Sequence, residues 1–469
     1  MVVLFDKISS KLLYLINING TLRDLNGMPY TIVGEGKIKD LNGRIYLVDN
    51  NKLVNTDIYG VEWDLNDATT LLTRVGKMSL HNANTGLPIQ NKMKRCLLLD
   101  NGNVNYYLNP NNSLQKEDGS ASVLDGTDGQ VMVEIPEHYR KFEFEGTKRR
   151  VLISERSFDG AHLVPLQYVS AFEATVYRPE NKLSSVINTT ADYRGGNNNA
   201  SWDGQDNSLL GKPASLISRI DFTDYATNRG PKWFQLLYQT YKDIIWLYMI
   251  EYAQRNSQTA FDSNLTIEGY RQGGLGAGVT NINSTDWNNF NSFYPFINCG
   301  QGTMDNYTSS TPFTHPVLGG TQIPQYRGIE NPFGHIWSWV EGINLRALPT
   351  DIEVYTANGY SFSNNDYVGY SLQGSTPTTN SYIKTLLNGS SSGHIEIVPS
   401  EIGASSTTYW SDFYNQSTPS SGESLRALRV GGSALTGVAA GLLGSASSLA
   451  PSSSLSASVG ARLCFIPSA

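Results

Sequence analysis

The sequence Leu425-Arg-Ala-Leu-Arg-Val-Gly-Gly-Ser433 begins a segment of unusual composition that ends at Gly460-Ala-Arg-Leu-Cys-Phe465. Between Val430 and Gly460 the chain contains no charged residue, no aromatic residue and no asparagine. Only Gly, Ala, Ser, Thr, Leu and Val occur there, with a single proline at Pro451. Arginines mark both borders, and both borders have the pattern of strands. The composition therefore predicts a surface insert whose ends are fixed by a folded domain.

Three other interpretations of this segment are weaker. A transmembrane helix needs about 20 predominantly apolar residues, but Ser and Gly interrupt residues 433–450 and Pro451 ends the run. A Gly/Ser linker joins two domains, but only nine residues follow Gly460, and residues 462–466 have the pattern of a closing strand. An ordinary loop is the third interpretation, but loops longer than about 15 residues are usually functional or disordered. We therefore expect no membrane insertion and a functional segment.

Two motifs in the second half of the chain resemble one known family. The first is Arg429-Val-Gly-Gly-Ser433 followed by Val459-Gly-Ala-Arg462, and the second is Asn331-Pro-Phe-Gly-His-Ile-Trp-Ser-Trp-Val340. Together they resemble the formylglycine-generating-enzyme branch of the C-type lectin fold. The order Gly-Gly-Ser-Ala, Gly-Leu, Ala-Pro-Ser and Gly-x-Arg-Leu-Cys-Phe is more narrowly similar to phage tail receptor-binding proteins that are diversified by retroelements. The resemblance covers roughly residues 160–469.

This resemblance implies where the chain contacts a ligand. In such systems the adenines of a template are randomised during reverse transcription, so Asn codons come to encode many small, apolar or polar residues. The positions at which these families vary fall within residues 434–458. Each residue type found at them is reachable from an adenine-rich Asn codon. The implied ligand-binding residues are Leu435, Thr436, Val438, Ala439, Leu443, Ala446, Ser448, Leu449, Ser452, Ser454, Leu455 and Ala457.

An aromatic run precedes this stretch. Tyr409-Trp-Ser-Asp-Phe-Tyr414 has four aromatic residues among six, and we include Tyr409 and Trp410 among the candidate ligand-binding residues. The alternative is that the run closes the core beneath the binding face. That alternative stays open for Trp410 and Phe413.

Length and turn signals predict a β-rich α+β protein. A chain of 469 residues exceeds what one hydrophobic core usually supports, so two or three domains are expected. We expect a β meander at residues 1–60, either an attachment or oligomerisation module or a plain β domain. A β-rich middle domain follows at residues 61–165. The resemblance implies that residues 166–469 form a C-type-lectin-like ligand-binding domain with a variable stretch at 434–458.

Local patterns predict individual elements. Asn-Gly pairs between apolar stretches indicate hairpins at Asn26-Gly27, Asn42-Gly43 and Asn101-Gly102. A helix is expected to start at Gly230-Pro231 and to run to Ala253, because apolar residues recur at spacings of three and four over most of its circumference. We expect this helix to be buried. A strand buried on both faces is expected around residues 336–341.

Charge and cysteine content narrow the range of partners. The net charge of −7 argues against nucleic acid, whose phosphates need clustered Lys and Arg. Three cysteines, Cys96, Cys299 and Cys464, are too few for a disulfide scaffold and lack zinc spacing. The first residues lack the pattern of a secretory signal. The 26 tyrosines, with abundant Ser, Gly and Asn, are typical of adaptable recognition surfaces.

The sequence gives little sign of catalysis. The positions at which the formylglycine-generating family carries its cysteines fall near Thr436 and Gly441, and neither residue can supply a thiolate. Glu143 and Glu145 have the spacing of a solvent-facing strand edge rather than of a catalytic pair. His335 is expected to be a satisfied core or turn histidine. We therefore expect no enzyme, no catalytic residue and no metal centre.

The resemblance raises calcium binding as an alternative, because some members of the resembled family bind calcium through Asp, Asn and backbone oxygens. Turns at Asp262, Asp305 and Asp366 offer such groups, but none matches a defined calcium spacing. No cofactor is therefore expected, with calcium as the alternative.

These observations predict a phage tail-fibre adhesin located in the virion tail. Its C-terminal surface would contact a bacterial surface protein or glycan, and its N-terminal region would bind other tail proteins. Because the stretch contains no Tyr, Trp or Arg anchor, each copy should bind weakly, and avidity predicts a homo-oligomer, which we expect to be a trimer. The alternative is a structural virion protein, of the tail or collar, that is not diversified.

Overall fold

The computed structural model describes most of the chain. The described residues are 2–6, 12–18, 21–23, 29–34, 37–40, 45–49, 52–55, 58–75, 87–205, 208–261, 296–300, 311–315, 319–360, 365–453 and 456–468. Several residues singled out in the sequence lie outside this set: Ser454, Leu455, Asp262, Asp305 and the Asn-Gly pairs at 26–27 and 42–43.

The chain divides into two compact units. The first comprises residues 1–66, 72–91 and 137–164, and the second comprises residues 67–71, 92–136 and 165–469. The expected boundary near residue 165 therefore needs correction. Residues 92–136, which we assigned to a middle domain, pack with the C-terminal part, because their strands share a sheet with strands from it.

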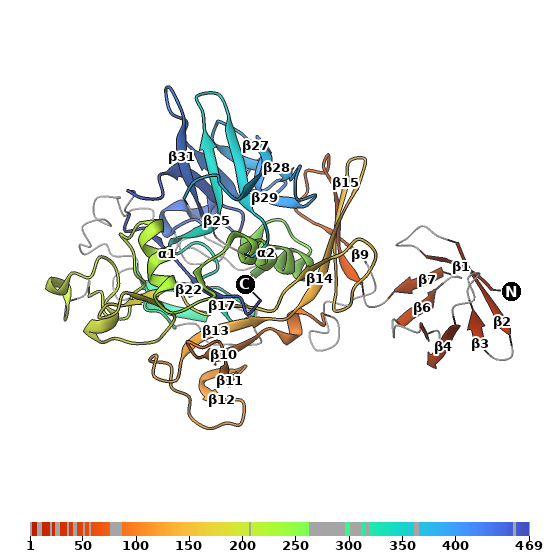
Figure 1. Cartoon of the computed structure of the whole chain (residues 1–469), viewed down its shortest axis with the longest axis horizontal. Coiled ribbons are helices and arrows are strands. Elements are labelled where there is room, and N and C mark those ends of the chain that lie inside the picture. Colours follow the sequence, from red (N-terminus) through yellow and green to blue (C-terminus); the bar gives the residue numbers. More distant parts are fainter. Residues whose placement is uncertain are drawn as a thin grey trace. The chain divides into compact units, whose positions relative to one another are not determined.

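The first unit contains two β structures (Figure 1). A closed barrel is formed by β1 (Val2–Asp6), β2 (Leu12–Ile18), β3 (Thr21–Arg23), β4 (Pro29–Gly34), β5 (Lys37–Lys39), β6 (Ile45–Asp49) and β7 (Lys52–Asn55). Strands of the barrel that follow one another in the sequence pair antiparallel, as the predicted meander requires. A parallel pairing of β1 with β7 closes the barrel. The other structure is a five-stranded sheet in the order β16 (His162–Val164), β14 (His138–Glu145), β15 (Lys148–Ser154), β8 (Tyr59–Asp64) and β9 (Thr73–Val75).

The second unit is built on two large sheets. The seven-stranded sheet has the order β12 (Asn112–Lys116), β11 (Val104–Asn109), β10 (Lys94–Leu98), β13 (Gln130–Ile135), β17 (Gln167–Ser170), β34 (Leu463–Phe465) and β20 (Trp233–Gln235). The nine-stranded sheet has the order β27 (Tyr370–Thr376), β26 (Ile352–Ala357), β25 (Trp337–Ala347), β31 (Ser424–Val430), β32 (Ser445–Leu449), β30 (Phe413–Gln416), β28 (Ser381–Asn388) and β29 (Ile395–Ile402), and β33 (Val459–Gly460) pairs with β25.

Short hairpins and helices complete this unit. The two-stranded pairs are β18 (Thr175–Tyr177) with β19 (Lys182–Ser184), β21 (Thr311–His315) with β22 (Gly319–Ile323), and β23 (Gln325–Tyr326) with β24 (Ile329–Glu330). The helices are α1 (Arg219–Thr227), α2 (Tyr238–Tyr252) and α3 (Ser257–Phe261). Among the described residues, the 3-10 helices are η1 (Gln90–Lys92), η2 (Ala191–Tyr193), η3 (Ala200–Trp202) and η4 (Ala434–Ala439). The protein is thus a β-rich α+β protein, as expected.

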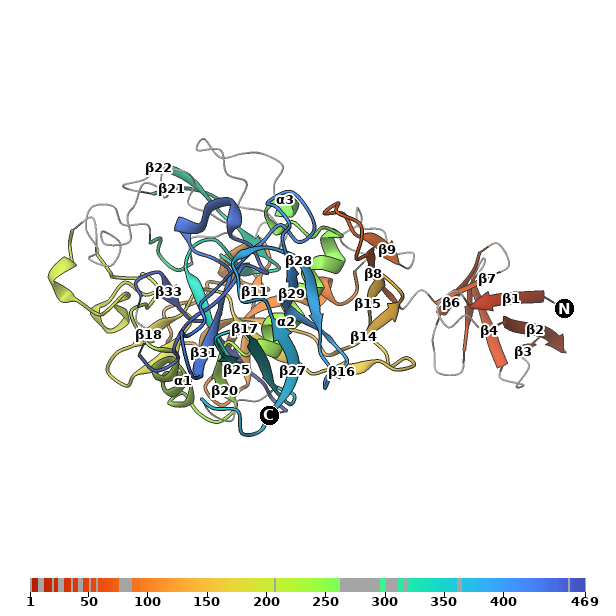
Figure 2. The ribbon, with the colours of Figure 1, turned by 90° about the horizontal axis from the view of Figure 1, so that it is seen from above.

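Helix α2 lies between the two large sheets, and Figures 1 and 2 both show it beside β25. Gln167 of β17 donates to Asp243 of α2 at 2.8 Å, which ties the helix to the seven-stranded sheet. Lys242 of α2 forms a fully buried ion pair with Glu396 of β29 at 3.1 Å, which ties the helix to the nine-stranded sheet. The prediction of a buried core helix is confirmed.

Three local predictions have mixed outcomes. The Asn101-Gly102 hairpin is confirmed, since β10 and β11 pair antiparallel around it. The strand buried on both faces is confirmed as the first half of β25. The predicted helix start at Gly230 is wrong, because residues 233–235 form β20 on the edge of the seven-stranded sheet and α2 begins only at Tyr238. Sequence inspection also missed α1, whose N-terminus is capped by the Ser218 hydroxyl.

Candidate functional site

Strand pairings fix both ends of the C-terminal segment. At its start, β31 lies between β25 and β32, antiparallel to both. At its end, β33 pairs parallel with β25, and β34 then enters the seven-stranded sheet between β17 and β20. The segment therefore leaves one sheet and ends in the other, and the predicted closing strand is confirmed.

Arg462 holds the closing end through backbone carbonyls. Its guanidinium donates to the carbonyl of Asn331 at 2.6 Å and to that of Glu330. A weaker bond of 3.4 Å reaches the carbonyl of Ser170. Arg462 is buried, so these bonds connect the two motifs that carry the family resemblance, the one around Asn331 and the one at the C-terminus.

Helices α2 and α3 hold the middle of the segment by its main chain. Gln258 donates its side-chain amide to the carbonyls of Gly437, at 3.1 Å, and Ala440, at 2.6 Å. The Tyr241 hydroxyl donates to the carbonyl of Leu442 at 2.5 Å, and the backbone N–H of Leu442 donates to the Ser257 hydroxyl at 3.1 Å. These bonds stabilise the path of the segment without using its side chains.

Asp412 also holds the middle of the segment, as Gln258, Tyr241 and Ser257 do. It is buried, and its carboxylate accepts a hydrogen bond from the backbone N–H of Leu443 at 2.8 Å. Burial, the largest effect, raises the pKa of this carboxyl to about 8, although hydrogen bonds from the N–H groups of Leu443 and Gly444 lower it. The sequence offered a weak signal for Asp412, which lies within the aromatic run at 409–414, and no signal for Gln258 or Tyr241.

Four of the candidate ligand-binding residues lie in the interior. Leu443, Ala446, Ala457 and Trp410 each expose at most 1% of their surface. Ala446 packs in the main core cluster beneath β25, and Ala457 packs in a second cluster with Ile336. Trp410 lies edge-on to Trp246 of α2, with ring centroids 6.1 Å apart. These four cannot reach a ligand in this structure, and the expectation of a surface insert needs correction because half of the segment fills the core.

Seven of the remaining described candidates, all except Tyr409, form two groups at the surface. We call the first group, Leu435, Thr436, Val438 and Ala439, the η4 surface. Val438 is the most open of them, with 52% of its surface exposed, and the other three are half-buried. The second group lies at and just after the end of β32, where Ser448 and Leu449 are half-buried and Ser452 is exposed.

The border arginines are bound to the end of β32. The guanidinium of Arg429 lies over the ring of Trp337, 4.9 Å from its centroid, and donates to the hydroxyl of Ser448 at 3.4 Å. Arg426 donates to the carbonyl of the same serine at 3.3 Å. Burial lowers the pKa of Arg429 to about 10, so it stays charged at neutral pH.

Tyr409 has a strained backbone, with φ at +54°. Its N–H donates to the carbonyl of Ala68 at 2.9 Å, and the guanidinium of Arg255 lies 5.9 Å from its ring. Tyr409 is half-buried and can contact solvent, whereas Trp410 closes the core, which was the alternative interpretation of the aromatic run.

Ionisable groups elsewhere are bound in structural roles. Nδ1 of His335 contacts the carboxylate of Glu173, and its Nε2 accepts the N–H of Ile297 at 3.2 Å, so the prediction of a satisfied core histidine is confirmed. All three cysteines are buried and free. In the described part of the chain, no group of three or more His, Cys, Asp or Glu residues is arranged to hold a metal ion. Asp366, one of the residues considered for calcium, accepts the backbone N–H of Val368 at 2.7 Å, as a turn residue does.

Comparison with known proteins gives no family. No protein-family model matches the chain, and no curated protein matches it. Among the described residues, no helix has both the length and the apolar character needed to span a bilayer.

Proposed function

We propose that the protein is a receptor-binding protein of a phage tail, and that its second unit contains a C-type-lectin-like domain whose η4 surface contacts the host. The motifs at 331–340, 429–433 and 459–462 support this proposal by their resemblance to that fold. The ligand is a protein or glycan of a bacterial surface, and the protein acts in the virion.

One observation carries the proposal. Four side chains outside the segment, those of Gln258, Tyr241, Ser257 and Asp412, bind its main-chain atoms. Because these bonds do not depend on the side chains of the segment, a replacement at Leu435, Val438 or Ala439 leaves them intact. A recognition surface that is diversified by mutation needs such a frame, since each new sequence must still fold.

The same geometry reduces the set of positions that can vary freely. A polar residue at Leu443, Ala446 or Ala457 would enter the core, where an unpaired polar group costs about 1–3 kcal/mol. We therefore assign ligand contact to the η4 surface and, secondarily, to Ser448, Leu449 and Ser452.

The chemistry of the η4 surface implies weak binding by each copy. Leu435, Val438 and Ala439 are aliphatic, and the energetic centres of interfaces are usually Trp, Tyr or Arg. Several copies on one particle would offset this weakness through avidity. We propose a homotrimer on this ground, with the N-terminal barrel binding other tail proteins.

Cell labelling tests the proposal. The fluorescently labelled full chain is incubated with a panel of bacterial strains, beside a variant that carries Leu435→Asn, Val438→Asn and Ala439→Asn. The matched control carries Val368→Asn and Leu372→Asn, two exposed apolar residues of the same unit outside the segment. We expect the wild type and the control to label the same strains, and the η4 variant to lose them or label others.

Two outcomes would oppose the proposal. Equal labelling by all three proteins would place recognition elsewhere on the chain. If the folded wild type labels no strain, a structural tail or collar component becomes the better interpretation.

A further inference from the structure

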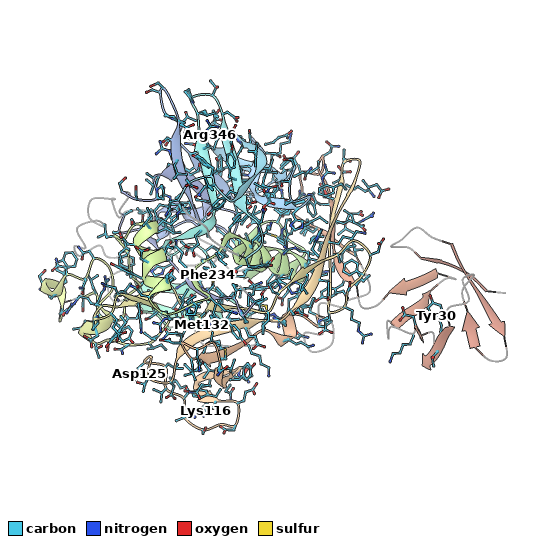
Figure 3. All side chains as sticks on the ribbon, in the orientation of Figure 1. Tyr30, Lys116, Asp125, Met132, Phe234 and Arg346 are labelled. Carbon is cyan, nitrogen blue, oxygen red and sulfur yellow. The ribbon has the colours of Figure 1, made fainter. Side chains whose placement is uncertain are left out.

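A cavity in the second unit is lined by no residue of the C-terminal segment. It has a volume of about 530 Å³, within the range of small-molecule pockets. Its lining residues are Arg229 and single residues that lie within the ranges 99–100, 125–130 and 177–193. Figure 3 shows Asp125, on this wall, at the edge of the second unit, whereas Met132 of β13 lies inside it.

Two tyrosines give the cavity an aromatic wall. The ring centroids of Tyr177 and Tyr193 lie 5.2 Å apart, with an angle of 37° between the ring planes. Tyr177 ends β18, Tyr193 ends η2, and the N–H of Arg178 joins the two elements by donating to the carbonyl of Asp192 at 2.8 Å. Both rings are half-exposed. The wall is therefore held in place before any ligand arrives.

The cavity also has polar groups that no neighbour uses. Gln130 exposes only 3% of its surface, and its Oε1 accepts the N–H of Ser185 at 2.9 Å. Its Nε2 has no hydrogen-bond partner among the described residues, nor do the hydroxyls of Tyr177 and Tyr193. Because all three residues line the cavity, these groups can form hydrogen bonds with a ligand or with water.

The charged residues of the cavity neutralise one another. Arg229 donates to Asp100 at 2.5 Å, to the hydroxyl of Ser184 at 2.7 Å and to the carbonyl of Leu183 at 2.7 Å. Lys182 pairs with Glu180 at 2.7 Å. Each of the three guanidinium nitrogens thus already donates one hydrogen bond within the protein. The carboxylates of the cavity are in ion pairs, except that of Asp125, which accepts the N–H of Thr127.

We propose that this cavity binds one neutral sugar residue of a glycan. A sugar ring presents C–H groups on one face, which pack on aromatic rings, and hydroxyls around its edge, which donate and accept hydrogen bonds. Tyr177 and Tyr193 supply the aromatic face, and the Gln130 amide and the two phenol hydroxyls supply the polar partners. An ionic ligand gains little here because the ion pairs are already made. This site does not depend on the η4 surface.

Ligand-observed NMR and calorimetry on the full chain test this assignment. The probes are glucose, galactose, mannose, N-acetylglucosamine and N-acetylgalactosamine, with inorganic phosphate and glucuronate as ionic probes. We expect at least one neutral sugar to bind with a millimolar Kd and the ionic probes not to bind. Tyr177→Ala and Tyr193→Ala should each weaken binding at least about tenfold, because each removes half of the aromatic wall.

Two further variants separate binding from folding. Tyr367→Ala is the matched control, because Tyr355 and Tyr367 form a similar half-buried ring pair, with centroids 4.9 Å apart, that does not line this cavity. Its affinity should equal that of the wild type. Thr127→Trp places an indole at an exposed position of the cavity wall, so it should abolish binding without disturbing the core. The assignment is overturned if no neutral sugar binds, if phosphate binds instead, or if a bound sugar is unaffected by the Tyr177, Tyr193 and Thr127 variants.

Discussion

Gly441 lies directly against the carboxylate of Asp412, so closely that a Cβ atom on Gly441 would be 1.9 Å from Oδ1 of Asp412. Asp412 is buried and accepts the N–H of Leu443, so a shift of its carboxylate would disturb this hydrogen bond. The family resemblance implies a catalytic cysteine near this position. In this chain the carboxylate of Asp412 occupies the space that a side chain at position 441 would need.

Gly441→Ala should destabilise the protein. The added methyl overlaps a buried carboxylate, and overpacking of this kind costs about 1–3 kcal/mol. Chemical denaturation followed by tryptophan fluorescence measures the loss. The Asp412→Ala background is the control: because the carboxylate is absent there, the cost of the alanine should fall by at least about 1 kcal/mol. Equal costs in both backgrounds would show that the contact with Asp412 is not the reason why a larger residue at position 441 is unfavourable.

Asp412 should make stability depend on pH. In the folded protein the pKa of its carboxyl is raised to about 8, whereas in the unfolded chain it is about 3.9. Between these values the folded state keeps a proton that the unfolded chain has released. The contribution of Asp412 to the free energy of unfolding should therefore be fully present below about pH 4 and be lost as pH rises towards 8, by at most about 1.4 kcal/mol per pH unit.

Asp412→Asn isolates this contribution, because asparagine has no proton to lose. Urea denaturation between about pH 4 and pH 8 should show a smaller fall for the variant than for the wild type. Glu341 is buried, and the pKa of its carboxyl is raised to about 7, so it gives a slope of the same sign in both proteins. Identical slopes for the two proteins would contradict the role of Asp412.

The division of the C-terminal segment into buried and exposed positions can be tested by one substitution at two sites. Ala446→Asn places an amide in the main core cluster and should cost at least about 2 kcal/mol. Val438→Asn changes a residue that is 52% exposed and should alter stability by less than about 0.5 kcal/mol. Denaturation midpoints measure both effects, and similar values for the two variants would oppose this division.

The two arginines at opposite borders should contribute unequally. Arg462→Met leaves the buried carbonyls of Glu330 and Asn331 without their donor, which should cost on the order of 3 kcal/mol. Arg429→Met loses a cation–π contact and a 3.4 Å hydrogen bond, worth about 1 kcal/mol. Thermal unfolding of the two variants gives the comparison. A larger loss for Arg429→Met would mean that the closing border is not the anchor of the segment.

The sequence predicted the parts of this fold that depend on local pattern. The Asn101-Gly102 turn, the buried face of α2 and the strand after Arg462 follow from turn chemistry and apolar periodicity. The start of α2 was missed because Trp233 and Phe234 fit an apolar helical pattern, although they belong to the edge strand β20. Their pairing with β34 is a contact between distant parts of the chain, which no local pattern reveals.

The limits of sequence reasoning are clearest in the candidate site. Alanine and serine occur both inside proteins and at their surfaces, so the composition of residues 434–458 did not separate buried Ala446 from half-buried Ala439. The side chains that hold the segment are far from it in sequence, as Gln258 and Tyr241 show. The resemblance named a set of positions but did not separate the buried ones from the exposed ones.

Site-specific photo-cross-linking at Val438 tests the central claim most directly. A Val438→Cys variant can be labelled selectively with a benzophenone maleimide, because the three native cysteines are buried. The labelled protein is irradiated on a strain that the wild type marks, beside a Leu372→Cys variant labelled in the same way at an exposed residue outside the segment. We predict a cross-link to a bacterial surface molecule from position 438 and none from position 372. Cell binding without a cross-link from position 438, or with equal cross-links from both positions, would contradict the account.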